Sequence, residues 1–141
     1  MKPQMDTDGH GCGDGTGCEP EQIDDVTRRV IGCAFAVANT LGSGFLEKVY
    51  ENALAHELRK VGFTVEQQKK TQVTCDDVVV GDYVADIVVE ERLLLEIKAA
   101  KSLDRVHFAQ ALNYLKATGL RIALLMNFGS PRIQVRRILN D

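Results

Sequence analysis

The stretch that decides the fold is residues 83–99, YVADIVVEERLLLEIKA, in which two apolar runs flank Glu90 and Glu91. Side chains alternate between the two faces of a β-strand, so each run predicts a strand and the pair predicts a hairpin. Pairing Asp86 opposite Glu96 places Glu91 at the centre of an odd-length turn, which a bulge accommodates. The apolar face is expected to carry the odd-numbered positions: Tyr83, Ala85, Ile87, Val89, Leu93, Leu95, Ile97 and Ala99.

Asp86, Glu96 and Lys98 then project from the other side of the hairpin. Charges on one strand face are commonly a solvated surface, and structural ion pairs give the same pattern. Here the three charged residues share their face with Val84 and Leu94, and such apolar residues are not favoured on a solvated face. Two close carboxylates raise each other's pKa, and Mg²⁺ compensates such pairs while keeping water and phosphate as further ligands. The residues alone leave a metal site and a structural ion-pair cluster both open.

The segments around the hairpin predict further helices and strands. Helices are expected at residues 23–41, 45–61 and 103–117, and strands at residues 63–68, 72–75, 78–80, 122–127 and 133–138. Gly42, Gly62 and Gly119 follow the three helices as C-terminal residues, and Ser102 is the expected N-cap of the third. This order predicts an α+β fold (α/β in the broad sense), with a mixed central sheet flanked by helices.

The composition bounds the class of protein. A chain of 141 residues with 45% hydrophobic and 26% charged residues is typical of one globular domain. Residues 1–20, rich in Gly and Asp, are expected to be a disordered tail, and residues 21–141 a single domain. No apolar stretch is long enough for a bilayer, and the first residues lack the apolar core of a secretory signal. We therefore expect a cytoplasmic protein without a membrane partner.

Charge and cysteines constrain the partners only weakly. The net charge is −3, but acids are concentrated before residue 25, so the remainder is near neutral and permits nucleic-acid binding without predicting it. Cys12 and Cys18 are not spaced like a usual zinc site, and a leader segment is the favoured interpretation over a metal site. Cys33 and Cys75 are expected to be small buried thiols.

Several motifs resemble a known family. Asp86, followed after nine residues by Glu96-Ile97-Lys98, is similar to the signature of the PD-(D/E)xK nuclease superfamily. More narrowly, four blocks resemble the GxxExxY protein family: GFLEKVY at 44–50, GDYVAD at 81–86, LNYL at 112–115 and NFGSP at 127–131. The resemblance spans residues 23–138. It implies a restriction-endonuclease-like αβββαβ core and a Mg²⁺-dependent (or Mn²⁺-dependent) nuclease that hydrolyses phosphodiester bonds, with DNA favoured over RNA.

The resemblance also implies roles for individual residues. Asp86, Glu96 and the backbone carbonyl of Ile97 would hold the metal, and Glu47 would be a third acidic ligand. Lys98 would orient the attacking water and offset developing charge. A helix-dipole contact for Glu47 and a simple salt bridge for Lys98 are the plainer alternatives.

Gln110 and Tyr114 lie at i and i+4 on the third predicted helix and would support the site and contact substrate. His107, one turn earlier, is equally consistent with phosphate binding and with a structural role. For Tyr50, packing or a hydrogen bond to the site is favoured over a catalytic role. The competing function is a non-catalytic, nuclease-fold binding or accessory module that acts with a partner protein, and a homodimer is consistent with either function.

Overall fold

The computed structural model describes residues 21–140; the expected tail, with Cys12 and Cys18, lies outside them. The helices are α1 (Ile23–Leu41), α2 (Glu47–Lys60) and α3 (Arg105–Thr118), and the strands are β1 (Val65–Cys75), β2 (Val78–Val89), β3 (Leu93–Lys98), β4 (Ile122–Asn127) and β5 (Gln134–Leu139). The strands form one sheet in the order β1-β2-β3-β4-β5. Only β3 and β4 are parallel, and α3 supplies their crossover.

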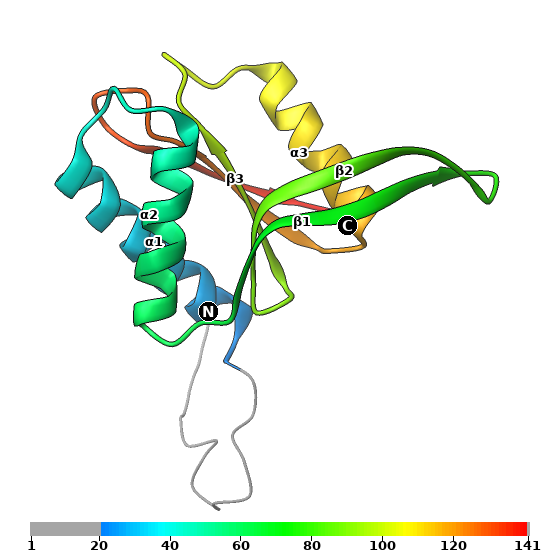
Figure 1. The fold of residues 1–141 in the computed structure, drawn as a ribbon, viewed down its shortest axis with the longest axis horizontal. Helices are drawn as coiled ribbons and strands as arrows, with labels where there is room; N and C mark the ends of the chain where they lie inside the picture. The colour runs from blue at the N-terminus through cyan, green and yellow to red at the C-terminus, as the bar shows by residue number, and fades with distance from the viewer. Residues whose placement is uncertain (1–20, 141) are drawn as a thin grey trace, which may run out of the picture.

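The sheet is the middle layer of the fold (Figure 1). One core cluster joins α1 and α2 to one sheet face, and a second joins Leu115 of α3 to the other. All of β4 is buried, and β3 is buried up to Ile97. Strands covered on both faces need continuous apolar runs, which Leu93-Leu94-Leu95 and residues 122–126 supply. The predicted mixed sheet flanked by helices is confirmed. None of the helices in residues 21–140 is long and apolar enough to cross a bilayer.

Strand boundaries differ from the prediction in the first hairpin. The expected breaks at residues 69–71 and 81–82 are absent, and the ladder between β1 and β2 runs from the Val65–Val89 pair to the Cys75–Val78 pair. Residues 66–72 are polar but still pair as part of a strand. Polar side chains fit there because both strands extend beyond the body as an arm whose side chains remain largely exposed. Cys33 is buried as expected, but Cys75, at the end of this arm, is exposed.

The predicted apolar face is wrong for Tyr83 and Ala85. Ile87 packs on the α1–α2 side of the sheet, whereas Tyr83 and Ala85 pack on the α3 side. The β1–β2 register pairs Gln67 with Ile87 and Lys69 with Ala85, without a pair at Gln68 and Asp86, and Gln68 has a φ of 54°. The sheet face of alternate residues in β2 therefore changes between Ala85 and Ile87, beside this unusual conformation of Gln68.

Helix α3 also begins later in the sequence than predicted. Its N-cap is Asp104, not Ser102. The Asp104 carboxylate accepts hydrogen bonds from the backbone nitrogens of Val106, at 3.0 Å, and His107, at 3.4 Å. The Nδ1 atom of His107 accepts one in return from the Asp104 nitrogen at 3.1 Å. This reciprocal capping box satisfies donors that the helix leaves free, and it gives His107 a structural role.

The segment after β4 ties the end of β3 to α2. The Asn127 side chain accepts hydrogen bonds from the backbone nitrogens of Ala100, at 2.9 Å, and Gly129, at 3.0 Å, and it donates one to the Ala100 carbonyl at 2.9 Å. The Phe128 ring stacks on Tyr50 of α2, with centroids 4.7 Å apart. The Tyr50 hydroxyl donates to the Gly42 carbonyl at 2.6 Å, which fixes the turn between α1 and α2.

Gly129 provides a direct test of this packing. A Cβ at position 129 would lie 2.5 Å from backbone atoms of Ala99 and Ala100. Gly129→Ala should therefore lower the free energy of unfolding by about 1–3 kcal/mol, measured by urea denaturation. Gly32→Ala is the matched control, because a Cβ there meets nothing within 4 Å in the middle of α1. That change should raise stability by about 0.5–1 kcal/mol. Equal stability of the two variants would contradict the packing described.

Candidate functional site

The site lies where β2 leaves β3. These strands pair only at Ile87–Leu95, Val88–Leu94 and Val89–Leu93, so residues 90–92 form the turn with Glu91 at its centre, as the sequence predicts. Beyond Ile87, β2 continues with β1 into the projecting arm (Figure 1). Asp86 and Glu96 occupy the next positions on the two strands. Both therefore stand at the mouth of the opening between β2 and β3.

Asp86 and Glu96 are held by reciprocal backbone contacts. The Oδ2 atom of Asp86 accepts a hydrogen bond from the Ile97 nitrogen at 2.8 Å. The Oε2 atom of Glu96 lies 3.4 Å from the Asp86 nitrogen, which donates to it. Each carboxylate thus caps a backbone group that the parting strands leave without a ladder partner. Burial raises the pKa of both carboxyl groups and the positive charge of Lys98 partly opposes that rise, so the structure brings all three residues together.

Glu96 is the most perturbed acid of the site. Its side chain is 5% exposed, and burial, followed by the charge of Asp86, raises its pKa from 4.5 to about 7. Burial also raises the pKa of Asp86, against the hydrogen bond from Ile97. Burial disfavours the charged form of an acid, and the two like charges oppose ionisation further. The pair is therefore poised to hold a proton near neutral pH.

Two tyrosines join the site from the α3 side. The Tyr83 hydroxyl donates to Oε2 of Glu96 at 2.5 Å. Its ring stacks on Tyr114 of α3 with centroids 3.6 Å apart. Burial, and then the charge of Glu96, raises the hydroxyl pKa of both tyrosines. Tyr83 was expected only in the apolar core; its side chain reaches Glu96 because β2 reverses its faces near Gln68.

Glu47 and Glu51 approach from α2. Glu47 is exposed, and its Oε2 atom accepts a weak hydrogen bond from the Ala99 nitrogen at 3.4 Å, just past β3. Glu51, which was not predicted as a site residue, is 4% exposed. It accepts hydrogen bonds from Gln67 at 2.7 Å, Gln68 at 2.8 Å and Lys48 at 3.2 Å. Its charge raises the pKa of Asp86. The only sequence signal for Glu51 is its i+4 spacing from Glu47.

Gln110 and Tyr114 have different environments. Tyr114 is half-buried against Tyr83, whereas the Gln110 side chain is exposed on α3 and makes no hydrogen bond to any residue between 21 and 140. The expected pair therefore shares one helix, but only Tyr114 contacts the group around Glu96. His107 caps the same helix and is committed to Asp104.

The donor set suits a hard cation. Asp86 and Glu96 offer carboxylate oxygens, and Mg²⁺ uses one or two of these with water and phosphate. Burial raises the pKa of both acids, and the charge of Asp86 raises that of Glu96 further, a penalty that a divalent cation offsets. No group of three or more His, Cys, Asp or Glu side chains able to surround a metal ion exists within the described residues. Asp86 and Glu96 therefore stand as a pair, with Glu47 and Glu51 outside it.

Comparisons with known proteins place these features in a family. The family model of the PD-(D/E)XK nuclease superfamily matches residues 24–138. Among solved structures, the crystal structure of SSO0001 is similar, with a TM-score of 0.54 and 20% identity over 67% of this chain and 50% of that chain. This likeness concerns the fold, and the chain spans about half the length of that protein. A search of curated proteins found no match. Because the family match covers most of the chain and includes Asp86, Glu96 and Lys98, the chain belongs to the PD-(D/E)XK nuclease superfamily.

Proposed function

We propose that the protein is a Mg²⁺-dependent (or Mn²⁺-dependent) nuclease that hydrolyses phosphodiester bonds in nucleic acid, with DNA as its substrate. The observation that carries the proposal is the pair formed by half-buried Asp86 and buried Glu96 beside Lys98, at the point where β2 leaves β3. Membership of the superfamily supports a nucleic-acid partner. Within it, we propose the GxxExxY protein family as the closer group, and residues 21–141 as its single domain.

The contacts of Tyr50, Asn127 and Gly129 support the closer family. Tyr50 belongs to the GxxExxY block and fixes the turn before α2 through the Gly42 carbonyl. Asn127 and Gly129 belong to the NFGSP block and hold the backbone after β3 at Ala100. Motif residues far from one another in sequence thereby position Glu47 and the end of β3.

In the proposed site, Asp86, Glu96 and the Ile97 carbonyl hold the metal, and Glu47 approaches it from α2 as a third acidic group. When bound, the metal polarises a phosphoryl oxygen and lowers the pKa of a coordinated water. Lys98 orients the attacking water and offsets the negative charge that develops on the phosphate.

Residues on the α3 side complete the proposed site. Tyr83 holds the orientation of Glu96 through its hydroxyl. Tyr114 supports Tyr83 by stacking, and Gln110, exposed four residues earlier on α3, contacts the nucleic-acid strand. The water-accessible position of Gln110 suits such a contact, because a side chain without a protein partner is free to bind a base or phosphate.

A non-catalytic accessory module is the second candidate. The observation that favours it is the lack of a three-residue metal cluster among residues 21–140. Under this function Asp86 and Glu96 would share a proton and bind no divalent cation. Metal binding therefore separates the two candidates before any substrate is known.

Metal affinity should depend on pH. Because the Glu96 pKa is raised to about 7, binding below that pH must displace a proton. We expect Mn²⁺ affinity to rise about tenfold per pH unit up to about 7 and to level off above it. Calorimetry in buffers of different ionisation enthalpy measures both the affinity and the released proton. Affinity that does not change between pH 6 and 8, taken as about one unit on either side of that pKa, would contradict this assignment.

The stability of the metal-free protein should also depend on the ionisation of Glu96. The raised pKa means that ionised Glu96 destabilises the folded state, from no effect below about pH 4.5 to the full effect above about pH 7. Glu96→Gln removes the charge and keeps an acceptor for Tyr83. It should therefore stabilise the metal-free protein by about 1–3 kcal/mol at pH 8, about one unit above that pKa, and have no such effect below pH 4.5. Urea denaturation at both pH values tests this, and a gain of equal size at both would refute it.

Nuclease assays test the proposed activity itself. Single- and double-stranded DNA, with RNA for comparison, are incubated with Mg²⁺ or Mn²⁺. Asp86→Asn and Lys98→Ala should each lower the cleavage rate at least about 100-fold, because each removes a group that acts on the reacting phosphate. Asp82→Asn is the matched control, since Asp82 is exposed on the same strand and should leave the rate unchanged. Cleavage that survives in both site variants would exclude this site.

A further inference from the structure

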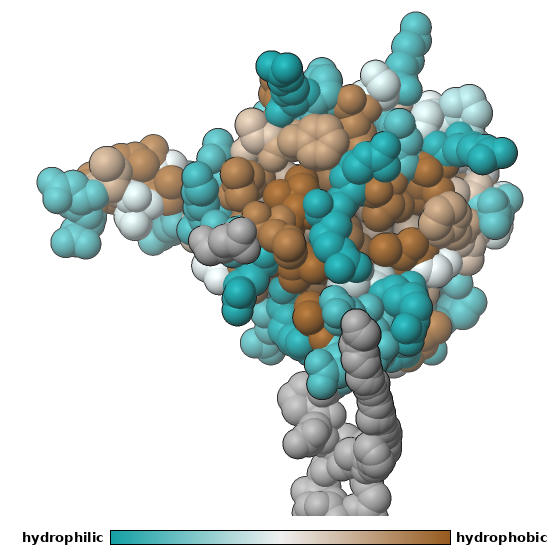
Figure 2. All heavy atoms as spheres, turned by 180° about the vertical axis from the view of Figure 1, so that it is seen from behind, coloured by the Kyte–Doolittle hydropathy of each residue, from teal (hydrophilic) through white to brown (hydrophobic). Residues whose placement is uncertain are grey.

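The β1–β2 arm ends in an apolar surface that nothing in the described chain covers. The arm projects beyond α3 (Figure 1), and seen from behind it is largely brown, with hydrophilic residues at its end (Figure 2). Val78, Val79 and Val80 are 60%, 50% and 61% exposed. Asp76 and Asp77 form the turn, with φ values of 53° and 61°. A two-stranded hairpin is only marginally stable alone, so these valines favour a partner surface.

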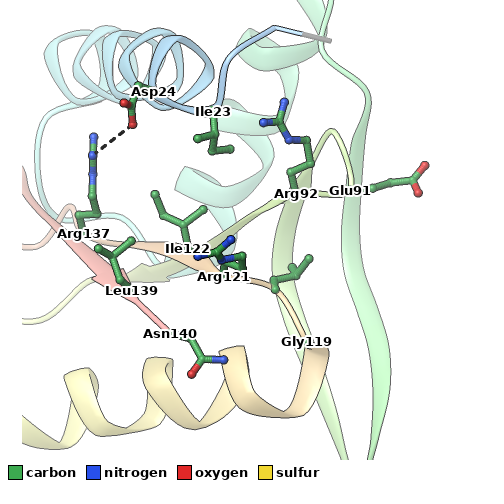
Figure 3. Close-up of a pocket in the computed structure, with 11 residues that line it drawn as sticks. Ile23, Asp24, Glu91, Arg92, Gly119, Arg121, Ile122, Arg137, Leu139 and Asn140 are labelled. Atoms are coloured by element: carbon green, nitrogen blue, oxygen red, sulfur yellow. Dashed lines mark ion pairs between the residues drawn. The ribbon is translucent and has the colours of Figure 1, made fainter. Parts of the chain in front are cut away.

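One cavity in the described chain has the complementary character, with apolar walls and positive charge. It measures about 590 Å³ and lies between the start of α1, the end of α3 and the first residues of β4 (Figure 3). Ile23 and Ile122 are among its apolar walls, and Arg92, Arg121 and Arg137 supply positive charge. The cavity is at the opposite end of β3 from Glu96, so it is separate from the proposed catalytic site.

The three arginines are not equally engaged. Arg92 donates to the Glu21 carbonyl at 2.5 Å, and Arg137 lies 3.6 Å from the exposed Asp24 carboxylate. The guanidinium of Arg121 is exposed and has no hydrogen bond or ion pair with any residue of the described segment, where only its backbone carbonyl accepts one, from the Asn140 nitrogen at 2.9 Å. Glu91 also lines the cavity, but its side chain points away from it in Figure 3. Arg121 therefore has the greatest capacity to bind a carboxylate.

A second cavity, of about 150 Å³, connects this region to the arm. It shares Glu91 and Leu120 with the large cavity, and its other walls include Lys69 of β1 and Ala85 of β2. The two cavities are therefore neighbours, and the second is lined partly by residues of the arm strands β1 and β2. We call this surface, lined by the residues of both cavities, the arm track.

We propose that the arm of a second copy of this chain lies in the arm track. Asp76 and Asp77 of one copy then meet Arg121 and Arg137 of the other, and the valines meet the apolar walls. Arg binds carboxylates through two parallel hydrogen bonds, which suits an acidic turn in an arginine pocket. Each copy carries both arm and track, and in the proposed dimer the exchange is reciprocal, so that it closes with two-fold symmetry. The acidic tip disfavours the phosphate backbone of nucleic acid as its partner.

Charge reversal tests the exchange in the full chain. Sedimentation equilibrium should show a dimer for the wild type, with a dissociation constant that rises with salt. Asp77→Arg and Arg121→Glu should each raise that constant at least about tenfold. The double variant should return to within about threefold of the wild type, because each arm again meets an opposite charge. All the substituted residues are exposed, and circular dichroism checks that each variant is folded.

Mixing the two single variants gives the sharpest outcome. An Asp77→Arg chain and an Arg121→Glu chain form a mixed dimer with one reversed and one wild-type contact, both attractive. The mixed dimer should therefore be tighter than either variant's own dimer. Glu57→Arg on α2 and Arg28→Glu on α1 are matched reversals away from the track and should leave the dimer unchanged. A wild type that stays monomeric at millimolar concentration, or a dimer insensitive to both reversals, would overturn the proposal.

Discussion

The burial of Glu96 is the constraint on which the site depends. A carboxylate on a strand covered on both sides is costly, and the structure offsets that cost only in part. Tyr83 and the Asp86 nitrogen donate to it, yet its pKa remains raised to about 7. Natural cores rarely retain such a group without a reason, and two repelling acids at one opening form a donor set that suits a divalent cation. The cost of ionised Glu96 to the folded state and the proposed metal chemistry thus have the same origin, which is the burial of this carboxylate.

The surrounding architecture maintains this opening. β2 pairs with β3 only from Ile87 to Val89, and the residues before Ile87 run with β1, where the Tyr83 hydroxyl meets Glu96. Asn127 holds the backbone beyond β3 at Ala100, so the opposite side of the opening is fixed by β4. Two independent attachments therefore keep Asp86 and Glu96 in register, one through the arm and one through the parallel pair of strands.

The hairpin and the opposition of Asp86 and Glu96 can be predicted from the sequence, because both follow from a two-residue period and the length of one turn. The prediction of the sheet face is wrong for Tyr83, because that face depends on how β2 pairs with another strand, β1, near Gln68. Glu51 is missed for a similar reason: a helical period places it on a buried face, but its partners Gln67 and Gln68 belong to β1. Ser102 and Asp104 are equally good caps by type, and the His107 side chain decides between them. Local periodicity is readable, whereas contacts between separate elements are not.

The two central strands also affect how the chain folds. Leu93-Leu94-Leu95 and residues 122–126 are apolar runs that remain unpaired until the α3 crossover closes, and parallel pairing of this kind is slow. Exposed runs of this type promote aggregation, and flanking charges oppose it. Arg92 and Lys98 bracket the first run, and Arg121 precedes the second. These cations occupy the positions that gatekeeper residues take beside aggregation-prone segments, so residues with roles in the finished structure also flank its most apolar runs.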